Sequence, residues 1–132
     1  MDRLFLDANV LFSAAYKADA RVFRLWTLPD VILCSSRYAL GEARFNLADE
    51  NRVNRLTSLI EKVQLSDAAK GDLPSSVRLP DKDAPILLAA IEAKCNYLLT
   101  GDVRHFGGYF GKPIEGVTII RPSQYLKIRN QD

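Results

Sequence analysis

The sequence predicts an α/β fold in which a mostly parallel sheet carries helices on both faces. Two observations support this: short apolar runs have the length of buried strands, and helical segments separate them. The runs are Arg3–Leu6, Val31–Cys34, Tyr97–Thr100 and Val117–Ile120. Strands that alternate with helices are typical of parallel sheets covered on both faces. A chain of 132 residues has the size of one domain, so we expect residues 1–132 to form a single domain.

Helices are expected throughout the N-terminal half, between and after the first two strands. They cover Ala8–Tyr16, Ala20–Leu28, a segment from Ser35-Ser36 to about Ala48, and Glu50–Val63. Pro29 closes the second helix, and either serine can cap the third. The fourth has apolar residues at helical spacing and basic residues on the opposite face, which is typical of a helix that packs on a core.

The C-terminal half starts with a connecting segment, Ser66–Pro80, that is rich in glycine, proline and serine. The buried helix Ala84–Lys94 follows and leads directly into the strand Tyr97–Thr100. A glycine-rich loop over residues 107–113 precedes the strand Val117–Ile120. Pro122 then opens a last short helix, since proline is favoured in the first helical turn.

Composition excludes several classes of protein. With 48% hydrophobic and 26% charged residues the chain is globular rather than disordered. Its apolar runs are too short for a membrane span, and Asp7 interrupts the first one, so we expect no membrane segment and no secretory signal. Cys34 and Cys95 lie in apolar segments, which favours reduced core residues in a cytoplasmic protein. A single histidine argues against structural zinc sites and serine–histidine triads, so any catalysis is expected to use carboxylates.

Acidic residues follow two of the predicted strands. Asp7 comes directly after Arg3–Leu6, and Asp102 follows Tyr97–Thr100 after one glycine. Ligands of open parallel sheets bind outside the carboxyl ends of the strands, so both acids are expected at the same edge. Asp7 is the harder of the two to explain structurally, because a charge after a buried strand needs partners. Asp102 could instead be a turn residue beside Gly101.

Three further acids can reach that edge. Asp81 and Asp83 precede the helix Ala84–Lys94, whose first turn should overlook the edge because the helix leads into a parallel strand. Glu42 lies in the helix that follows the second strand. Each also has an ordinary structural explanation, since Asp83 can cap its helix, Asp81 can cap or be solvated, and Glu42 can be exposed.

Carboxylates crowded at one edge repel one another unless a cation neutralises them. Oxygen-only ligands favour Mg²⁺ or Mn²⁺ over zinc, and such an ion can promote hydrolysis of a phosphodiester without histidine. The net charge of +2 becomes clearly positive once several acids are committed to a metal, which suits a polyanionic partner.

Taken together, four stretches of the chain resemble the PIN-domain family, and most closely the VapC-like toxin ribonucleases of prokaryotic toxin–antitoxin pairs. They are Leu-Asp7-Ala-Asn9-Val-Leu, Glu42 in the third helix, Asp81-Lys-Asp83-Ala-Pro-Ile-Leu-Leu-Ala-Ala, and Tyr-Leu-Leu-Thr100-Gly-Asp102-Val-Arg-His-Phe. The likeness covers essentially the whole chain. No single motif is specific, but their order and spacing are.

The resemblance implies a three-layer α/β/α sandwich with strand order 3-2-1-4-5 and a metal-dependent ribonuclease that leaves 5′-phosphate and 3′-hydroxyl ends. The four acids that would hold one or two Mg²⁺ or Mn²⁺ ions and serve catalysis are Asp7, Glu42, Asp83 and Asp102. Asp81 would be an accessory acid, and Asn9 and Thr100 would be polar supports of the site. Asp83 is preferred to Asp81 because the acid of the family sits just before the apolar helix.

Partners follow from the same resemblance. Arg104, His105 and Lys112 are candidates to hold the RNA backbone, with Arg37 and Arg44 as further candidates, although solvated surface charges are the ordinary reading for most basic residues. A small antitoxin would fold onto a groove formed by Ala20–Leu28 and Glu50–Val63, and a homodimer is common in the family. The aromatic residues of the first segment, Phe23 and Trp26, are groove residues on this view and core residues on the other.

Two other functions stay open. The chain could be a PIN-like nuclease of RNA processing that is not a toxin, or a non-catalytic module that uses its acids for metal or RNA binding alone. A receiver-like domain fits badly, because Ser35 and Arg121 stand after the strands where an aspartate and a lysine would be needed. A dinucleotide-binding domain fits worse, since no glycine-rich loop follows the first strand.

Overall fold

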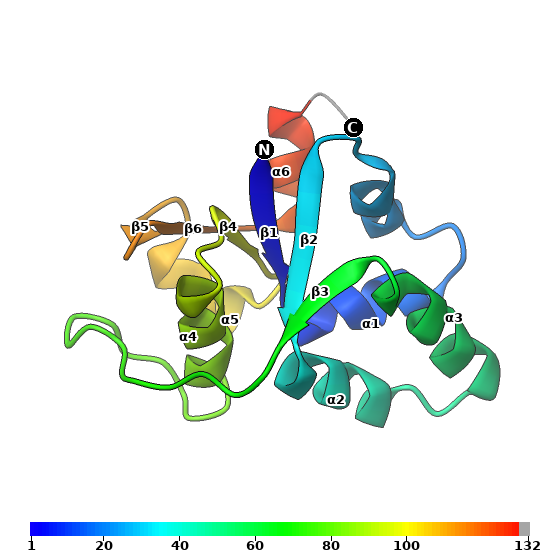
Figure 1. The fold of residues 1–132 in the computed structure, drawn as a ribbon, viewed down its shortest axis with the longest axis horizontal. Coiled ribbons are helices and arrows are strands. Elements are labelled where there is room, and N and C mark those ends of the chain that lie inside the picture. The colour runs from blue at the N-terminus through cyan, green and yellow to red at the C-terminus, as the bar shows by residue number, and fades with distance from the viewer. Residues whose placement is uncertain (130–132) are drawn as a thin grey trace.

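The computed structural model describes residues 1–129 and contains one mixed sheet flanked by helices (Figure 1). In spatial order the strands of the sheet are β3-β2-β1-β4-β6-β5. Their bounds are β1 (Asp2–Leu6), β2 (Val31–Ser36), β3 (Val63–Ser66), β4 (Tyr97–Leu99), β5 (Pro113–Ile114) and β6 (Val117–Ile120). All neighbours pair in parallel except β5, which is antiparallel to β6. The predicted α/β class and mostly parallel sheet are confirmed.

Helices lie on both sides of this sheet. They are α1 (Ala8–Tyr16), α2 (Arg37–Asn46), α3 (Glu50–Ile60), α4 (Ala84–Glu92), α5 (Val103–Phe106) and α6 (Pro122–Ile128), with the 3₁₀ segments η1 (Arg21–Thr27) and η2 (Gly107–Tyr109). Crossovers between parallel strands are right-handed almost without exception. In this sheet the chain runs outward from β1 through β2 to β3 before it returns to β4 and β6. The helices before β3 and the helices between β3 and β6 therefore cover opposite faces, and Figure 1 shows α1 and α3 on one side of β1 and β2 with α4 and α5 on the other. The C-terminal helix α6 packs against η1.

Several element boundaries differ from the sequence-based expectation. The helix predicted to end at Val63 stops at Ile60, and Val63 begins β3; Val63 continues the apolar spacing of the helix and so hid the start of the strand. The helix predicted over Ala20–Leu28 is a 3₁₀ helix, η1, rather than an α-helix. Leu25 is the fully buried side chain of η1. The short helix α5, for which no element was predicted, precedes the stretch 107–113 that was predicted as a loop, and η2 opens that stretch. The fifth position of the predicted order 3-2-1-4-5 is held by β6, with β5 added outside it.

The central strand β1 fixes the edge of the sheet at which the acids gather. Leu4, Phe5 and Leu6 are fully buried, and β1 pairs with β2 on one side and β4 on the other. Leu6 is in register with Leu99, and the backbone N–H of Asp7 donates to the Leu99 carbonyl at 3.1 Å. The residues that follow β1 and β4 are therefore held side by side.

The helix α4 carries Asp83 to the same edge. Pro85 lies in its first turn, where proline is compatible with the helix because the first amides have no intrahelical acceptor. Ile86, Leu87 and Ala90 are buried against the sheet. Cys34 and Cys95 are buried as free thiols, as expected for core residues. Within residues 1–129, none of the helices combines the length and apolar character needed to cross a bilayer.

We predict that Leu87→Ala destabilises the protein by about 2–5 kcal/mol, because the side chain is fully buried and its removal leaves a cavity. Phe45→Ala is the matched control: this aromatic side chain is 89% exposed, so its loss should change the free energy of unfolding by about 0.5 kcal/mol or less. Urea titrations followed by circular dichroism measure both. Equal effects of the two substitutions would contradict the assigned core.

Candidate metal centre at the carboxyl edge

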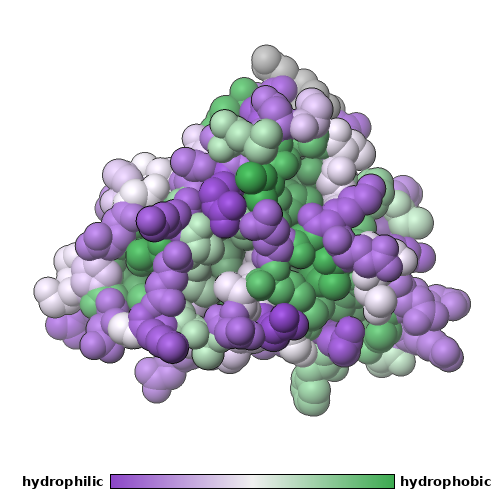
Figure 2. Space-filling model, in the orientation of Figure 1, coloured by the Kyte–Doolittle hydropathy of each residue, from purple (hydrophilic) through white to green (hydrophobic). Residues whose placement is uncertain are grey.

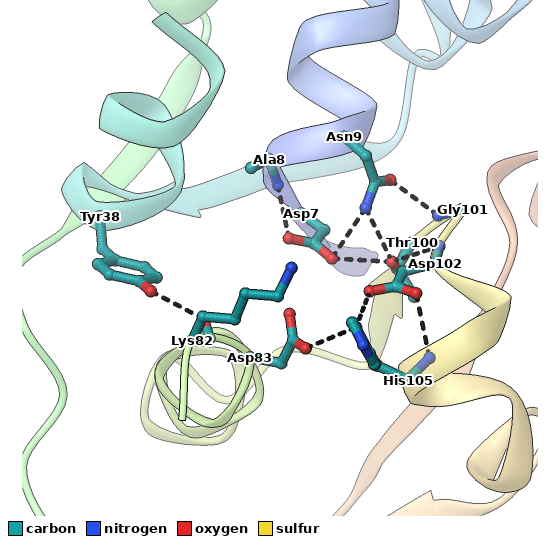
Figure 3. Close-up of polar contacts among 10 residues, drawn as sticks. All are labelled: Asp7, Ala8, Asn9, Tyr38, Lys82, Asp83, Thr100, Gly101, Asp102 and His105. Atoms are coloured by element: carbon teal, nitrogen blue, oxygen red, sulfur yellow. Dashed lines mark hydrogen bonds and ion pairs between the residues drawn. The ribbon is translucent and has the colours of Figure 1, made fainter. Parts of the chain in front are cut away.

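Acidic side chains from four separate parts of the chain line one cavity at the carboxyl edge of the sheet. The cavity has a volume of about 680 Å³. Its acids are Asp7 after β1, Glu42 on α2, Asp83 before α4 and Asp102 after β4. The structure thus brings together all four of the acids that the sequence analysis assigned to a metal site. Figure 3 shows Asp7, Asp83 and Asp102 pointing toward a common centre.

Asp7 is the most deeply buried of these acids, with 4% of its surface exposed. It caps α1, since its Oδ1 accepts from the Ala8 N–H at 2.6 Å. Its Oδ2 accepts from the Thr100 hydroxyl at 2.8 Å and from the Asn9 amide at 3.1 Å. The carboxylate is therefore held in one orientation by donors from two strand ends.

Thr100 and Asn9 tie the ends of β1 and β4 together (Figure 3). The Thr100 hydroxyl accepts from the Asn9 amide at 3.2 Å and from the Asp102 N–H at 3.0 Å while donating to Asp7. Asn9 in turn accepts from the Gly101 N–H through Oδ1 at 2.8 Å. Both residues, predicted as polar supports, contact the acids directly through these hydrogen bonds.

A histidine joins Asp83 and Asp102. His105 places Nδ1 2.8 Å from Asp102 Oδ2 and 2.9 Å from Asp83 Oδ2. The Asp102 carboxylate also caps α5, because its Oδ1 accepts from the His105 N–H at 3.1 Å. Asp83 stands at the N-cap position of α4 but its side chain makes no capping hydrogen bond, so the purely structural explanation considered for this residue does not account for it.

Lys82 was not singled out by the sequence analysis, yet it also lines the acidic cavity. Figure 3 shows its side chain extending from the start of α4 toward the acids. The Tyr38 hydroxyl donates to the Lys82 carbonyl at 2.8 Å and so links α2 to this segment. The position of Lys82 directly before Asp83 was the available signal, since the neighbour of a candidate ligand is carried to the same edge.

Burial and mutual repulsion disfavour the charged form of three of the acids. Burial raises the pKa of Asp7 from its ordinary 3.8 to about 6, although the Thr100 and Ala8 donors oppose this. Burial likewise raises the pKa of Glu42 and of Asp83, and the Asp83 charge adds to the effect on Glu42. At Asp102 burial is outweighed by hydrogen bonds from His105, which hold the pKa below its ordinary value.

The remaining predicted residues do not line the acidic cavity, although His105 contacts two of its acids. Asp81 is exposed and lines a neighbouring cavity beside Tyr38 and Pro85. The candidate RNA contacts Arg104 and Lys112 are both exposed, whereas His105 is half-buried among the acids. Arg37 and Arg44 on α2 are exposed, and Arg37 pairs with Asp67 at 2.9 Å.

The donor set fits a hard divalent cation. Asp83, Asp102 and His105 offer ligand atoms that lie within 4.8 Å of one another. Among the buried side-chain polar atoms of residues 1–129, Asp83 Oδ2 stands out as one that receives no hydrogen bond. A buried carboxylate oxygen without a donor is costly, and a cation at this point would offset that cost. Asp7 and Glu42 complete an oxygen-rich lining of the kind that Mg²⁺ and Mn²⁺ prefer.

Comparison with known proteins agrees with this geometry. The family model of the PIN domain matches residues 3–104, which include all four acids of the cavity and end just before His105. No curated protein sequence matches the chain.

Three solved structures share the fold. The first is VapBC2 from Rickettsia felis bound to a DNA fragment from its promoter, with a TM-score of 0.64 and 15% identity over 90% of this chain and 98% of the other. VapBC-1 from nontypeable Haemophilus influenzae has a TM-score of 0.61 and 14% identity over 92% of this chain and 98% of the other. VapC20 from Mycobacterium tuberculosis is a toxin that cleaves the sarcin–ricin loop. It has a TM-score of 0.56 and 17% identity over 85% of this chain and 97% of the other.

We predict that Asp7 makes the metal-free protein less stable as the pH rises. The folded state binds the Asp7 proton more tightly than the unfolded chain does, so the contribution is fully present below about pH 4 and is lost as the pH passes 6. A shift of this size corresponds to about 3 kcal/mol.

The measurement is urea unfolding between pH 4 and 7.5 in the presence of a chelator, for the parent protein and for Asp7→Asn. The free energy of unfolding of the parent should fall relative to that of the variant, because the amide does not titrate. Parallel pH profiles for the two proteins would show that Asp7 is ionised normally in the fold.

Proposed function

Because the chain belongs to the PIN-domain family, we propose that it is a metal-dependent endoribonuclease that hydrolyses RNA phosphodiester bonds. The observation that carries this proposal is the convergence of Asp7, Glu42, Asp83 and Asp102 on one cavity of about 680 Å³. A site of this size and acidity is too crowded with negative charge to receive a phosphodiester unaided. It becomes suited to one when a divalent ion is bound.

The four acids would hold Mg²⁺ or Mn²⁺, with Asp83 rather than Asp81 as the ligand from the segment before α4. The bound ion supplies neutralisation of the carboxylates and Lewis-acid stabilisation of charge on the phosphodiester. Thr100 and Asn9 keep the Asp7 carboxylate oriented through their hydrogen bonds to Oδ2. Lys82 is placed to contact a phosphate oxygen at the cavity mouth, since its side chain lines the cavity and reaches from an exposed position.

Basic residues near α5 would extend the contact with RNA. Arg104 and Lys112 are exposed and follow Asp102 in the chain, so they are available to phosphates that flank the cleaved bond. Arg37 and Arg44 are exposed on α2, the helix that carries Glu42, and are candidates for the same role.

We further propose that the protein is the toxin of a type II toxin–antitoxin pair and that a small antitoxin blocks the site. The solved structures with the same fold are VapBC complexes and a VapC toxin, which supports this assignment. Phe23 is 40% exposed on η1, whereas Trp26 donates its indole N–H to the Leu59 carbonyl at 3.0 Å and fastens η1 to α3. Figure 2 shows hydrophobic surface in the region of β3 and α3, which an antitoxin or a second copy of the chain would cover.

A cytoplasmic location is in keeping with an RNA substrate and with the two buried free thiols, Cys34 and Cys95. The alternative of a PIN nuclease in RNA processing shares the same site and differs in its target and in the absence of a neutralising partner. A non-catalytic module would bind metal or RNA without cleavage.

We predict that Asp7→Asn and Asp83→Asn each abolish cleavage of RNA, while Asp81→Asn loses far less activity because Asp81 lies outside the acidic cavity. Cleavage is measured on a labelled RNA with Mg²⁺ or Mn²⁺ and again with a chelator, which should stop it. Asp19→Asn removes the same charge from an exposed turn and should leave the rate unchanged. Circular dichroism checks that the variants are folded. Retention of full activity by Asp7→Asn would contradict the mechanism.

We expect induced expression of the protein in bacteria to arrest growth, and expression of Asp7→Asn to have no effect. Co-expression of the small protein encoded next to the gene should restore growth and should copurify with the toxin. Cleavage in vitro without growth arrest would favour the RNA-processing alternative. Binding of RNA without cleavage in any metal would favour the non-catalytic one.

A further inference from the structure

His105 occupies a position that the four-acid description of the site does not explain. It is the only histidine in the chain, and its ring lies between two carboxylates instead of facing outward with Arg104. We propose that His105 Nδ1 is itself a ligand of the divalent ion and that this nitrogen biases the site toward Mn²⁺ over Mg²⁺. This inference rests on the proposed metal-dependent function and assigns one more residue to its site.

The distances around Nδ1 are those of neighbouring ligand atoms on one ion. Two ligands at about 2.1 Å from a metal and at right angles to each other are separated by roughly 3 Å. The separations from Nδ1 to Asp102 Oδ2 and to Asp83 Oδ2 are 2.8 and 2.9 Å. Nδ1 therefore stands from each of the two oxygens at the spacing of two ligand atoms on one ion, and the ligand atoms of the three residues lie within 4.8 Å of one another.

The buried Asp83 oxygen provides a second, independent observation. Asp83 is 7% exposed, and its Oδ2 lies beside Nδ1 but accepts no hydrogen bond. The reason is that Nδ1 carries at most one hydrogen, and the hydrogen-bond geometry is met at Asp102 Oδ2. The two carboxylate oxygens beside Nδ1 therefore share a single hydrogen-bond donor, and Asp83 Oδ2 is left without one. A cation that contacts Nδ1 and both oxygens would satisfy all three atoms at once.

The ring is held in place by short-range structure. The backbone N–H of His105 donates to Asp102 Oδ1 at 3.1 Å, and the next residue, Phe106, is fully buried and anchors α5 in the core. In the neutral tautomer with hydrogen on Nε2, Nδ1 offers its lone pair to the same point. The ligand is thus preorganised without a change of backbone.

An imidazole ligand changes which metal the site prefers. Mg²⁺ takes oxygen ligands and water almost exclusively, whereas first-row transition ions accept imidazole nitrogen. Among these ions Mn²⁺ is one that carboxylate-rich sites also suit. Three or four carboxylates with one imidazole therefore form a set that Mn²⁺ satisfies better than Mg²⁺ does.

The test uses Mn²⁺ as the probe and the full-length protein without a polyhistidine tag. Pulsed electron paramagnetic resonance of the Mn²⁺-loaded protein should show a ¹⁴N coupling from a directly bound imidazole, which can arise only from His105 because the chain has no other histidine. Calorimetric titrations with Mn²⁺ and Mg²⁺ follow for the parent, for His105→Ala and for His105→Asn. Both variants should lose the coupling and about tenfold or more in Mn²⁺ affinity, with a smaller change for Mg²⁺.

The possible failures are distinguishable. Binding of Mn²⁺ without a ¹⁴N coupling in the parent protein would overturn the role of His105 while leaving the acidic site intact. Tighter binding of Mn²⁺ to His105→Ala would mean that the imidazole competes with the ion, and would also overturn the proposal. No binding of either ion to the parent would overturn both this inference and the metal-dependent function. The spectrum is recorded on the parent protein, so this part of the test does not depend on whether the variants fold.

Discussion

Repulsion between carboxylates that are buried at one edge of the sheet is the constraint on which the rest of the site depends. Asp7 is 4% exposed and Asp83 is 7% exposed, and both face a cavity that Glu42 and Asp102 also line. Burying like charges together costs free energy that a fold of ordinary stability cannot ignore. Most of the polar contacts described around the cavity can be understood as responses to this cost.

The responses differ from one acid to the next. Asp7 receives donors from Ala8, Thr100 and Asn9, and Asp102 receives two from His105. Asp83 receives none at Oδ2. The protein thus orients the acids on the two adjacent strand ends with its own groups and leaves the acid on α4 incompletely satisfied. This asymmetry supports the proposed metal site over a purely structural network.

Strand positions and the convergence of the acids could be predicted because both follow from chain-local patterns and from the topology of parallel sheets. Apolar runs in the sequence marked the strands β1, β2, β4 and β6. The acids that directly follow β1 and β4 meet at one edge because neighbouring parallel strands end at the same edge of a sheet. The strand β3 could not be separated from the helix before it, since Val63 fits both periodicities. The contact of His105 with two carboxylates depends on a side-chain direction within a four-residue helix, and sequence spacing carries no information about that.

The two-residue strand β5 has a consequence for how molecules of this protein can associate. It covers the outer side of β6, and its first residue, Pro113, has no amide hydrogen with which to pair a further strand. Edge-to-edge pairing of this sheet with the sheet of a second molecule is therefore disfavoured at β5. The other edge of the sheet, Val63–Ser66, keeps its amides for such pairing, but the strand there is only four residues long.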